Sequence, residues 1–268
     1  MQNIDPLYIL EPLIVIVLSV GLILYWRSRG NRFTRYALIF SLVAYAGAIL
    51  VKIVVQLLTV TAVTTTFGSE SIATGLYYGI QTSLFEVGGA FLVARYAVAR
   101  GRFTEKDAGA YGISLAFWEN GVYLGLFSLI SIVSIYGVLA AGPPAAAKQL
   151  YNALQSSESS LFAPPAVALP QVGLGILERI SSILCHCAWG YLCVLAAVFK
   201  RNIYFAIALP MGLVDFFVPF VNLLGLPLFE GIVFLFSVAS LLIAVSVGRD
   251  IRGQLPPPET PETAPSPS

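Results

Sequence analysis

Charged residues are scarce in this 268-residue chain. Asp, Glu, Lys and Arg together make up 11% of it, whereas a soluble domain carries about 25%. Hydrophobic residues account for 57%. So little charge cannot cover a water-exposed surface, which excludes an ordinary soluble protein. The composition predicts an all-α, multi-pass integral protein of the cell membrane, in contact with membrane lipid.

Clustered basic surface and disulfide-type cysteine spacing are also missing. The formal net charge is only +1, which excludes nucleic acid as a partner because phosphate binding needs concentrated positive charge. The three cysteines, Cys185, Cys187 and Cys193, share one apolar segment and have neither a disulfide framework nor a zinc-binding spacing. Consecutive helical residues project about 100° apart, so Cys185, His186 and Cys187 cannot all bind one ion. We interpret the cysteines as packing residues.

Long apolar runs fill most of the chain. A membrane span needs roughly 20 apolar residues, and seven segments qualify: about 7–26, 36–60, 72–98, 108–141, 175–199, 203–224 and 228–248. No basic residue precedes the first run, so we expect a retained span rather than a cleaved signal. The sequence predicts a seven-span domain over residues 1–252 and a disordered, Pro-rich cytosolic tail over 253–268.

Lys and Arg residues alternate along the chain in a way that predicts orientation. Almost all of them fall in the first, third and fifth connections and in the tail, and the other connections hold only Lys148. Because cytoplasmic loops carry the excess of basic residues, we predict an outside N-terminus and a cytosolic C-terminus. The only long outer loop, at about 142–174, has room for a short surface helix.

Four ionisable residues of different spans are predicted to lie at one depth. Glu86, Glu119, His186 and Asp215 are each 13 or 14 residues from the cytosolic basic residue that flanks their helix. At about 1.5 Å per residue this places all four about 20 Å from that flank, near the bilayer middle. A single charge there costs roughly 2.5–3.5 kcal/mol on insertion scales. A shared depth therefore predicts one polar site in which the four satisfy one another or share an ion.

Other charged residues of the spans do not fit this depth. The same count places Lys52 and Glu178 nearer the outer surface. Arg179 is interpreted there as an interfacial anchor or as a partner for a helix end.

Three carboxylates and one imidazole suit several kinds of chemistry. They match Zn²⁺ or a similar divalent metal with one position left open for water, beside which a carboxylate acts as general base. The same groups suit a proton relay, or a hydrogen-bonded cluster that only fixes helix packing. The residues alone leave these three interpretations open.

Four short motifs in this region resemble those of a known superfamily. They are "LFEVGGAF", "GISLAFWENGVYLG", "LERISSILCHCAWGYLCVL" and "ALPMGLVDFF", and they carry Glu86, Glu119, His186 and Asp215 in that order. The order resembles the intramembrane metalloproteases of the YhfC and PrsW families and the CAAX-protease and bacteriocin-processing (CPBP) families. The resemblance covers about residues 80–222, within a site-bearing core at about 72–224.

The resemblance implies a metal-dependent endopeptidase, with zinc as the expected metal. Its substrate would be a membrane-embedded or membrane-proximal peptide or protein. Glu86 corresponds to the glutamate that activates water. Glu119, His186 and Asp215 correspond to residues that bind the metal or stabilise the developing oxyanion, so Glu86 and Glu119 are the expected catalytic residues.

The motifs also depart from the superfamily pattern. Val87 stands where a second Glu is expected, Ala90 where an Arg is expected and Met211 where a His is expected. Arg95 is a candidate substitute for the missing Arg, although it lies closer to the cytosol. Three functions stay open: a divergent active protease, a relative without catalysis that serves as a membrane binding or scaffold protein, and a proton-coupled transporter.

Overall fold

The protein is described by a computed structural model that covers residues 3–254. Within that range it is all-α and contains no strand, as predicted. The elements are η1 (Pro6–Ile9), α1 (Leu10–Ser28), α2 (Arg35–Phe67), α3 (Ile72–Gln81), η2 (Thr82–Val87), α4 (Gly88–Ala99), η3 (Glu105–Asp107), α5 (Ala108–Ala116), η4 (Phe117–Leu126), α6 (Phe127–Ala141), α7 (Pro144–Ser157), η5 (Ser159–Phe162), α8 (Pro165–Phe199), α9 (Asn202–Ala208), η6 (Leu209–Phe220), α10 (Val221–Leu224) and α11 (Leu226–Gln254).

Within the described residues, six helices are long and apolar enough to cross a membrane, which confirms a multi-pass membrane protein. They are Pro6–Ser28, Arg35–Phe67, Glu105–Ala141, Pro165–Phe199, Asn202–Leu224 and Leu226–Ile251. The remaining predicted span, 72–98, coincides with the unbroken helical run α3–η2–α4. This run contains Gln81, Glu86 and Arg95 and is therefore less apolar. A bundle of roughly seven helices agrees with the sequence prediction.

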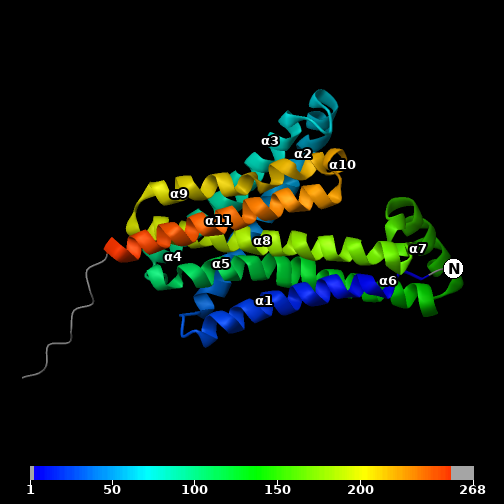
Figure 1. Cartoon of the computed structure of the whole chain (residues 1–268), viewed down its shortest axis with the longest axis horizontal. Coiled ribbons are helices and arrows are strands. Elements are labelled where there is room, and N and C mark those ends of the chain that lie inside the picture. The colour runs from blue at the N-terminus through cyan, green and yellow to red at the C-terminus, as the bar shows by residue number, and fades with distance from the viewer. Residues whose placement is uncertain (1–2, 255–268) are drawn as a thin grey trace, which may run out of the picture.

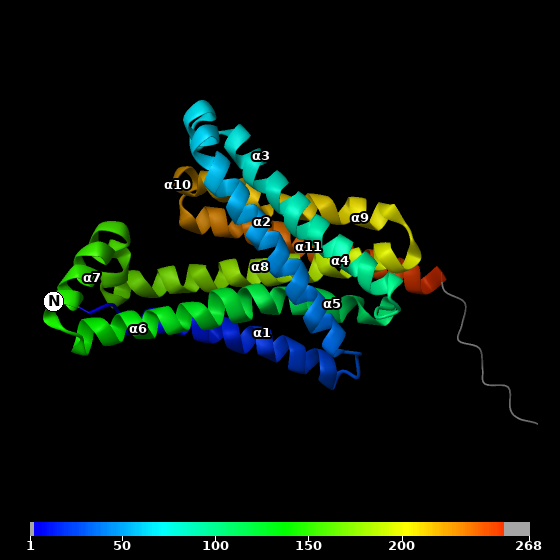
Figure 2. The ribbon, with the colours of Figure 1, turned by 180° about the vertical axis from the view of Figure 1, so that it is seen from behind.

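The helix α8 forms the centre of the bundle (Figures 1 and 2). In its most apolar stretch 67% of the residues are buried, compared with 33% or less in the other five candidate spans. It packs against α1, α4, α5, α9 and α11. In Figure 2, α2 crosses diagonally over helices that run roughly parallel to one another. Many large apolar side chains on the outside are exposed, among them Leu57, Leu58 and Leu242, as expected for a surface that contacts lipid.

Two of the connections that hold basic residues lie at the same end of the bundle: α4–α5 with Arg100, Arg102 and Lys106, and α8–α9 with Lys200 and Arg201. The α4–α5 and α8–α9 connections and the end of α11 lie at one end, and the N-terminus and α7 lie at the other (Figure 1).

The long loop does carry a surface helix, α7, and α8 begins at Pro165, ten residues before the predicted span. The helix α11 continues to Gln254, two residues into the predicted tail, and residues 255–268 lie outside the described residues.

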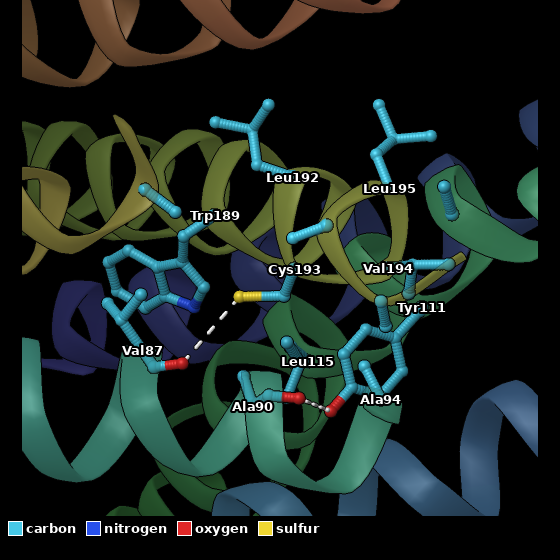
Figure 3. Close-up of a cluster of buried hydrophobic side chains, with 14 of the residues drawn as sticks. Val87, Ala90, Ala94, Tyr111, Leu115, Trp189, Leu192, Cys193, Val194 and Leu195 are labelled. Carbon is cyan, nitrogen blue, oxygen red and sulfur yellow. Dashed lines mark hydrogen bonds between the residues drawn. The ribbon is translucent and has the colours of Figure 1, made fainter. Parts of the chain in front are cut away.

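An apolar cluster joins α8 to α4 and α5 (Figure 3). Trp189, Leu192 and Cys193 of α8 are at most 2% exposed. The hydroxyl group of Tyr111 donates a 2.9 Å hydrogen bond to the carbonyl oxygen of Ala90, and the Cys193 thiol donates weakly to the carbonyl oxygen of Val87 at 3.6 Å. The three cysteines are free. Cys185 and Cys193 are buried in this cluster, in agreement with their predicted packing role, whereas Cys187 is only partly buried.

Two close backbone contacts at glycines fix helix positions near the middle of the bundle. A Cβ atom on Gly112 of α5 would lie 2.5 Å from the carbonyl oxygen of Cys187 on α8. A Cβ atom on Gly212 of η6 would lie 2.5 Å from Cα of Ser83 in η2. Only glycine allows this approach without displacing backbone, and the second contact sets the distance between η2 and η6.

Candidate metal centre

Both glutamates of the predicted site lie in π-helical segments. Glu86 is in η2 and Glu119 is in η4, each between stretches of ordinary α-helix. A π turn inserts an extra residue per turn and changes the direction in which nearby side chains project, and such turns are frequent at functional sites. Sequence periodicity gave no sign of these segments.

His186 approaches the glutamates from the regular helix α8. Its ring is held at Nδ1, the nitrogen that points away from the glutamates. Its Nδ1 donates a 2.9 Å hydrogen bond to the carbonyl oxygen of Ser182 and also lies 3.3 Å from the Ser182 hydroxyl group. That hydroxyl group accepts a 3.0 Å hydrogen bond from the amide of Asn120. The ring of Trp189 lies 4.2 Å away, centroid to centroid. With its proton on Nδ1, the imidazole presents the lone pair of Nε2 to the glutamates.

The three side chains converge on one point. Nε2 of His186 lies 2.5 Å from Oε2 of Glu119 and 3.7 Å from Oε2 of Glu86. One ligand atom from each residue lies within 4.8 Å of the other two. Glu86 and His186 are buried, at 9% and 3% exposure. The common depth predicted for these three residues therefore corresponds to actual proximity.

The donor set fits a divalent metal ion. One imidazole nitrogen and two carboxylates are ligand types that zinc takes in catalytic sites. Oε2 of Glu119 is buried and, among the described residues, has no hydrogen bond of good geometry, even though Nε2 of His186 is close by. Positive charge, supplied by a bound metal ion or by a proton on Nε2 of His186, would satisfy both atoms.

Asp215 lies beside this group but outside it. It is carried by η6, a 3₁₀ segment, and its Oδ2 accepts hydrogen bonds from Nζ of Lys52 at 2.8 Å and from the Thr82 hydroxyl group at 2.5 Å. Nζ of Lys52 also lies 2.6 Å from Oε1 of Glu86. Asp215 is thus connected to the three converging residues through an ammonium group.

The prediction that Lys52 does not join the layer of site residues was wrong, because its ammonium group contacts Glu86 and Asp215. The residue count measures distance along the axis of α2, and α2 crosses the other helices obliquely (Figure 2). Three additional residues along a tilted helix change the depth in the membrane only slightly. The four-carbon side chain of lysine spans the remaining distance to the other site residues. The side chain of Lys52 is only 14% exposed.

The three converging residues and the neighbouring Lys52–Thr82–Asp215 group line one cavity of about 230 Å³. The cavity extends along α8 from His186 to Arg179 and Glu178, which contact each other. The guanidinium side chain of Arg179 is 15% exposed. The sequence analysis interpreted Arg179 only as an anchor or helix-end partner, and its place in the cavity wall was missed.

The residues that depart from the superfamily motifs lie in the packed interior. Val87 and Ala90 are fully buried in the apolar cluster that faces α8 (Figure 3), and Met211 is 3% exposed. Arg95 lines a different cavity, together with Lys200. It therefore does not replace the missing Arg at the converging residues.

The comparison with family models agrees with this geometry. The model described as YhfC intramembrane metalloprotease matches residues 14–236. The chain belongs to the YhfC family. The match extends well beyond the 80–222 region of motif resemblance, and it makes this YhfC protein a member of a metalloprotease family, for which a divalent metal and peptide substrates are implied. Neither the curated proteins nor the solved structures include a significant match.

Proposed function

We propose that this YhfC protein is an intramembrane endopeptidase that uses a divalent metal, zinc, to hydrolyse membrane-embedded or membrane-proximal peptides. The observation that carries the proposal is the convergence of Glu86, Glu119 and His186, from three separate elements, within 4.8 Å. The family match supports the reaction class. The cavity of about 230 Å³ gives the reacting peptide bond a polar environment inside an apolar bundle.

His186 and Glu119 are the residues proposed to hold the metal. Nε2 of His186 lies 2.5 Å from Oε2 of Glu119, closer than to Oε2 of Glu86, and the Nδ1 hydrogen bond to Ser182 already orients the imidazole. A bound zinc ion supplies Lewis-acid polarisation of a peptide carbonyl group and activation of water. Asp215 contributes through Lys52, whose ammonium group it helps to hold.

Glu86 is the proposed general base. Its Oε1 is engaged by Lys52, so Oε2 is the oxygen that faces His186 and Glu119. There it accepts a proton from a water molecule as the water oxygen bonds to the peptide carbonyl carbon. It then delivers this proton to the amide nitrogen as the carbon–nitrogen bond breaks. The carboxylate returns to its starting state.

The test is Glu86→Gln in protein reconstituted into liposomes with a pool of fluorogenic transmembrane peptides. We expect cleavage to fall by at least about a hundredfold, because general-base catalysis contributes about 10²–10⁴-fold, while zinc content stays close to wild type. Glu105→Gln is the matched control, because Glu105 is exposed and is not among the residues that line the site cavity. Cleavage at the wild-type rate in Glu86→Gln would remove Glu86 from the catalytic role. Proton flux without cleavage in the same liposomes would favour the transporter instead.

A further inference from the structure

The ammonium group of Lys52 is the one cation among the described residues in direct contact with the candidate centre. It makes three hydrogen bonds, to Oε1 of Glu86 at 2.6 Å, to Oδ2 of Asp215 at 2.8 Å and to Oγ1 of Thr82 at 2.7 Å. An ammonium group has three donors, so all of them are used. Lys52 therefore has no donor left for a substrate oxygen and cannot act on the substrate directly.

The contact restricts what Glu86 can do. A carboxylate near a metal ion binds it through one oxygen or both, and a free glutamate at this position would become an additional ligand. Here Lys52 holds Oε1, and the tethered carboxylate keeps its other oxygen, Oε2, 3.7 Å from Nε2 of His186, whereas Oε2 of Glu119 lies 2.5 Å from the same nitrogen. Thr82 keeps the ammonium group in place, since its hydroxyl group accepts from Lys52 and donates to Asp215.

The contact also sets the charge of the cluster. Glu86, Glu119 and Asp215 with one ammonium group have a formal charge of −2 when the imidazole is neutral. Glu178 and Arg179, farther along the cavity, cancel each other. A divalent cation would make this buried site neutral, which is the favourable condition in a low-dielectric interior.

We propose that Lys52 is a positioning residue with two effects. It keeps Glu86 out of the metal's ligand set, so that Glu86 remains a base, and it matches the charge of the cluster to a divalent ion. The inference rests on the proposed function. It makes an unusual prediction: removing Lys52 strengthens metal binding and weakens catalysis. A lysine that only stabilised the fold would not strengthen metal binding when removed.

The main variant is Lys52→Met, which shortens the side chain by one atom and removes its charge and donors. Zinc affinity of the detergent-purified full chain is measured by competition with a chelator. We expect it to rise by at least about tenfold, because a nearby positive charge is lost and Glu86 gains access to the ion. The visible absorption of a Co²⁺-substituted sample should change as an oxygen ligand is added. Turnover of the peptide pool should fall by at least about tenfold with KM little changed.

A double-mutant cycle identifies the cause. In wild-type protein Glu86→Gln should change zinc affinity by less than about threefold, whereas in Lys52→Met it should weaken zinc binding by at least about tenfold, because Glu86 has become a ligand there. Lys52→Arg keeps the charge and should retain zinc affinity within about threefold of wild type.

Unchanged or weaker zinc binding in folded Lys52→Met would overturn the inference, and so would a Lys52→Arg variant with tenfold tighter binding. If Lys52→Met does not fold, the Lys52→Arg result decides. A different result would contradict the proposed function alone: the protein binds zinc and shows the expected Lys52–Glu86 coupling in zinc affinity, but wild type cleaves no peptide. A wild-type protein that binds neither Zn²⁺ nor Co²⁺ would end both.

Discussion

The carbonyl oxygen of Ser182 accepts a 2.9 Å hydrogen bond from Nδ1 of His186, one helical turn farther along α8. The hydroxyl group of the same serine is a second, longer contact at 3.3 Å. The main chain therefore orients the ring, and the side chain only assists.

Ser182→Ala tests this division of roles. We expect zinc affinity to fall by less than about threefold, well below the 10–100-fold typical when a metal-binding histidine loses its only partner. The measurement is chelator competition on purified protein. A loss of tenfold or more would mean that the hydroxyl group, rather than the carbonyl oxygen, holds the ring.

His186→Ala should abolish most zinc binding, because it removes the only nitrogen ligand of the converging group. Metal analysis of purified protein, by mass spectrometry of the bound elements, measures the zinc per chain. Cys187→Ala is the matched control, since the neighbouring side chain projects about 100° away on the helix. Equal zinc content in wild type and His186→Ala would contradict the candidate centre.

The distribution of basic residues predicts the orientation in the membrane. In a variant without native cysteines, we expect a cysteine at position 155 to react with a membrane-impermeant maleimide from outside, and one at position 105 to react only from the cytosolic side. Both positions are exposed in the structure. Labelling of both from the same side would contradict the predicted topology.

Gly212→Ala should destabilise the bundle. The added methyl group would lie 2.5 Å from Cα and 2.6 Å from the backbone nitrogen of Ser83, and backbone atoms cannot move aside cheaply. We expect the free energy of unfolding to fall by about 1–3 kcal/mol. Gly137→Ala is the control, because no atom lies within 4 Å of the position that its added methyl group would take and Ala is favoured in a helix by about 0.5–1 kcal/mol. Thermal unfolding in detergent compares the two, and equal melting temperatures would contradict the tight contact.

Counting residues from the basic flanks predicted the convergence of Glu86, Glu119 and His186. The method depends on helices that run roughly parallel at about 1.5 Å per residue. It placed Lys52 wrongly because α2 is oblique. It also treated Asp215 as an ordinary helical residue, whereas η6 is a 3₁₀ segment with a rise of about 2.0 Å per residue and a different angular step.

The direction of each side chain was beyond the reach of sequence reasoning. Glu86 lies in the π-helical segment η2, and a π turn changes the direction of nearby side chains without a sign in the hydrophobic periodicity. The hydrogen bonds of Lys52 to three residues on two other elements are non-local. What could be found from sequence was the all-α membrane fold and the residue types at mid-membrane depth.

The burial of Val87 and Ala90 has a consequence for how sequences of this family vary. Both side chains are fully buried in the apolar cluster that they share with residues of α5 and α8. A glutamate or arginine at either position would need space that these neighbouring side chains now fill. The residues on η2 and α4 should therefore change together with those on α5 and α8 across relatives, and a single substitution toward the charged motif should harm the protein unless its neighbour changes with it.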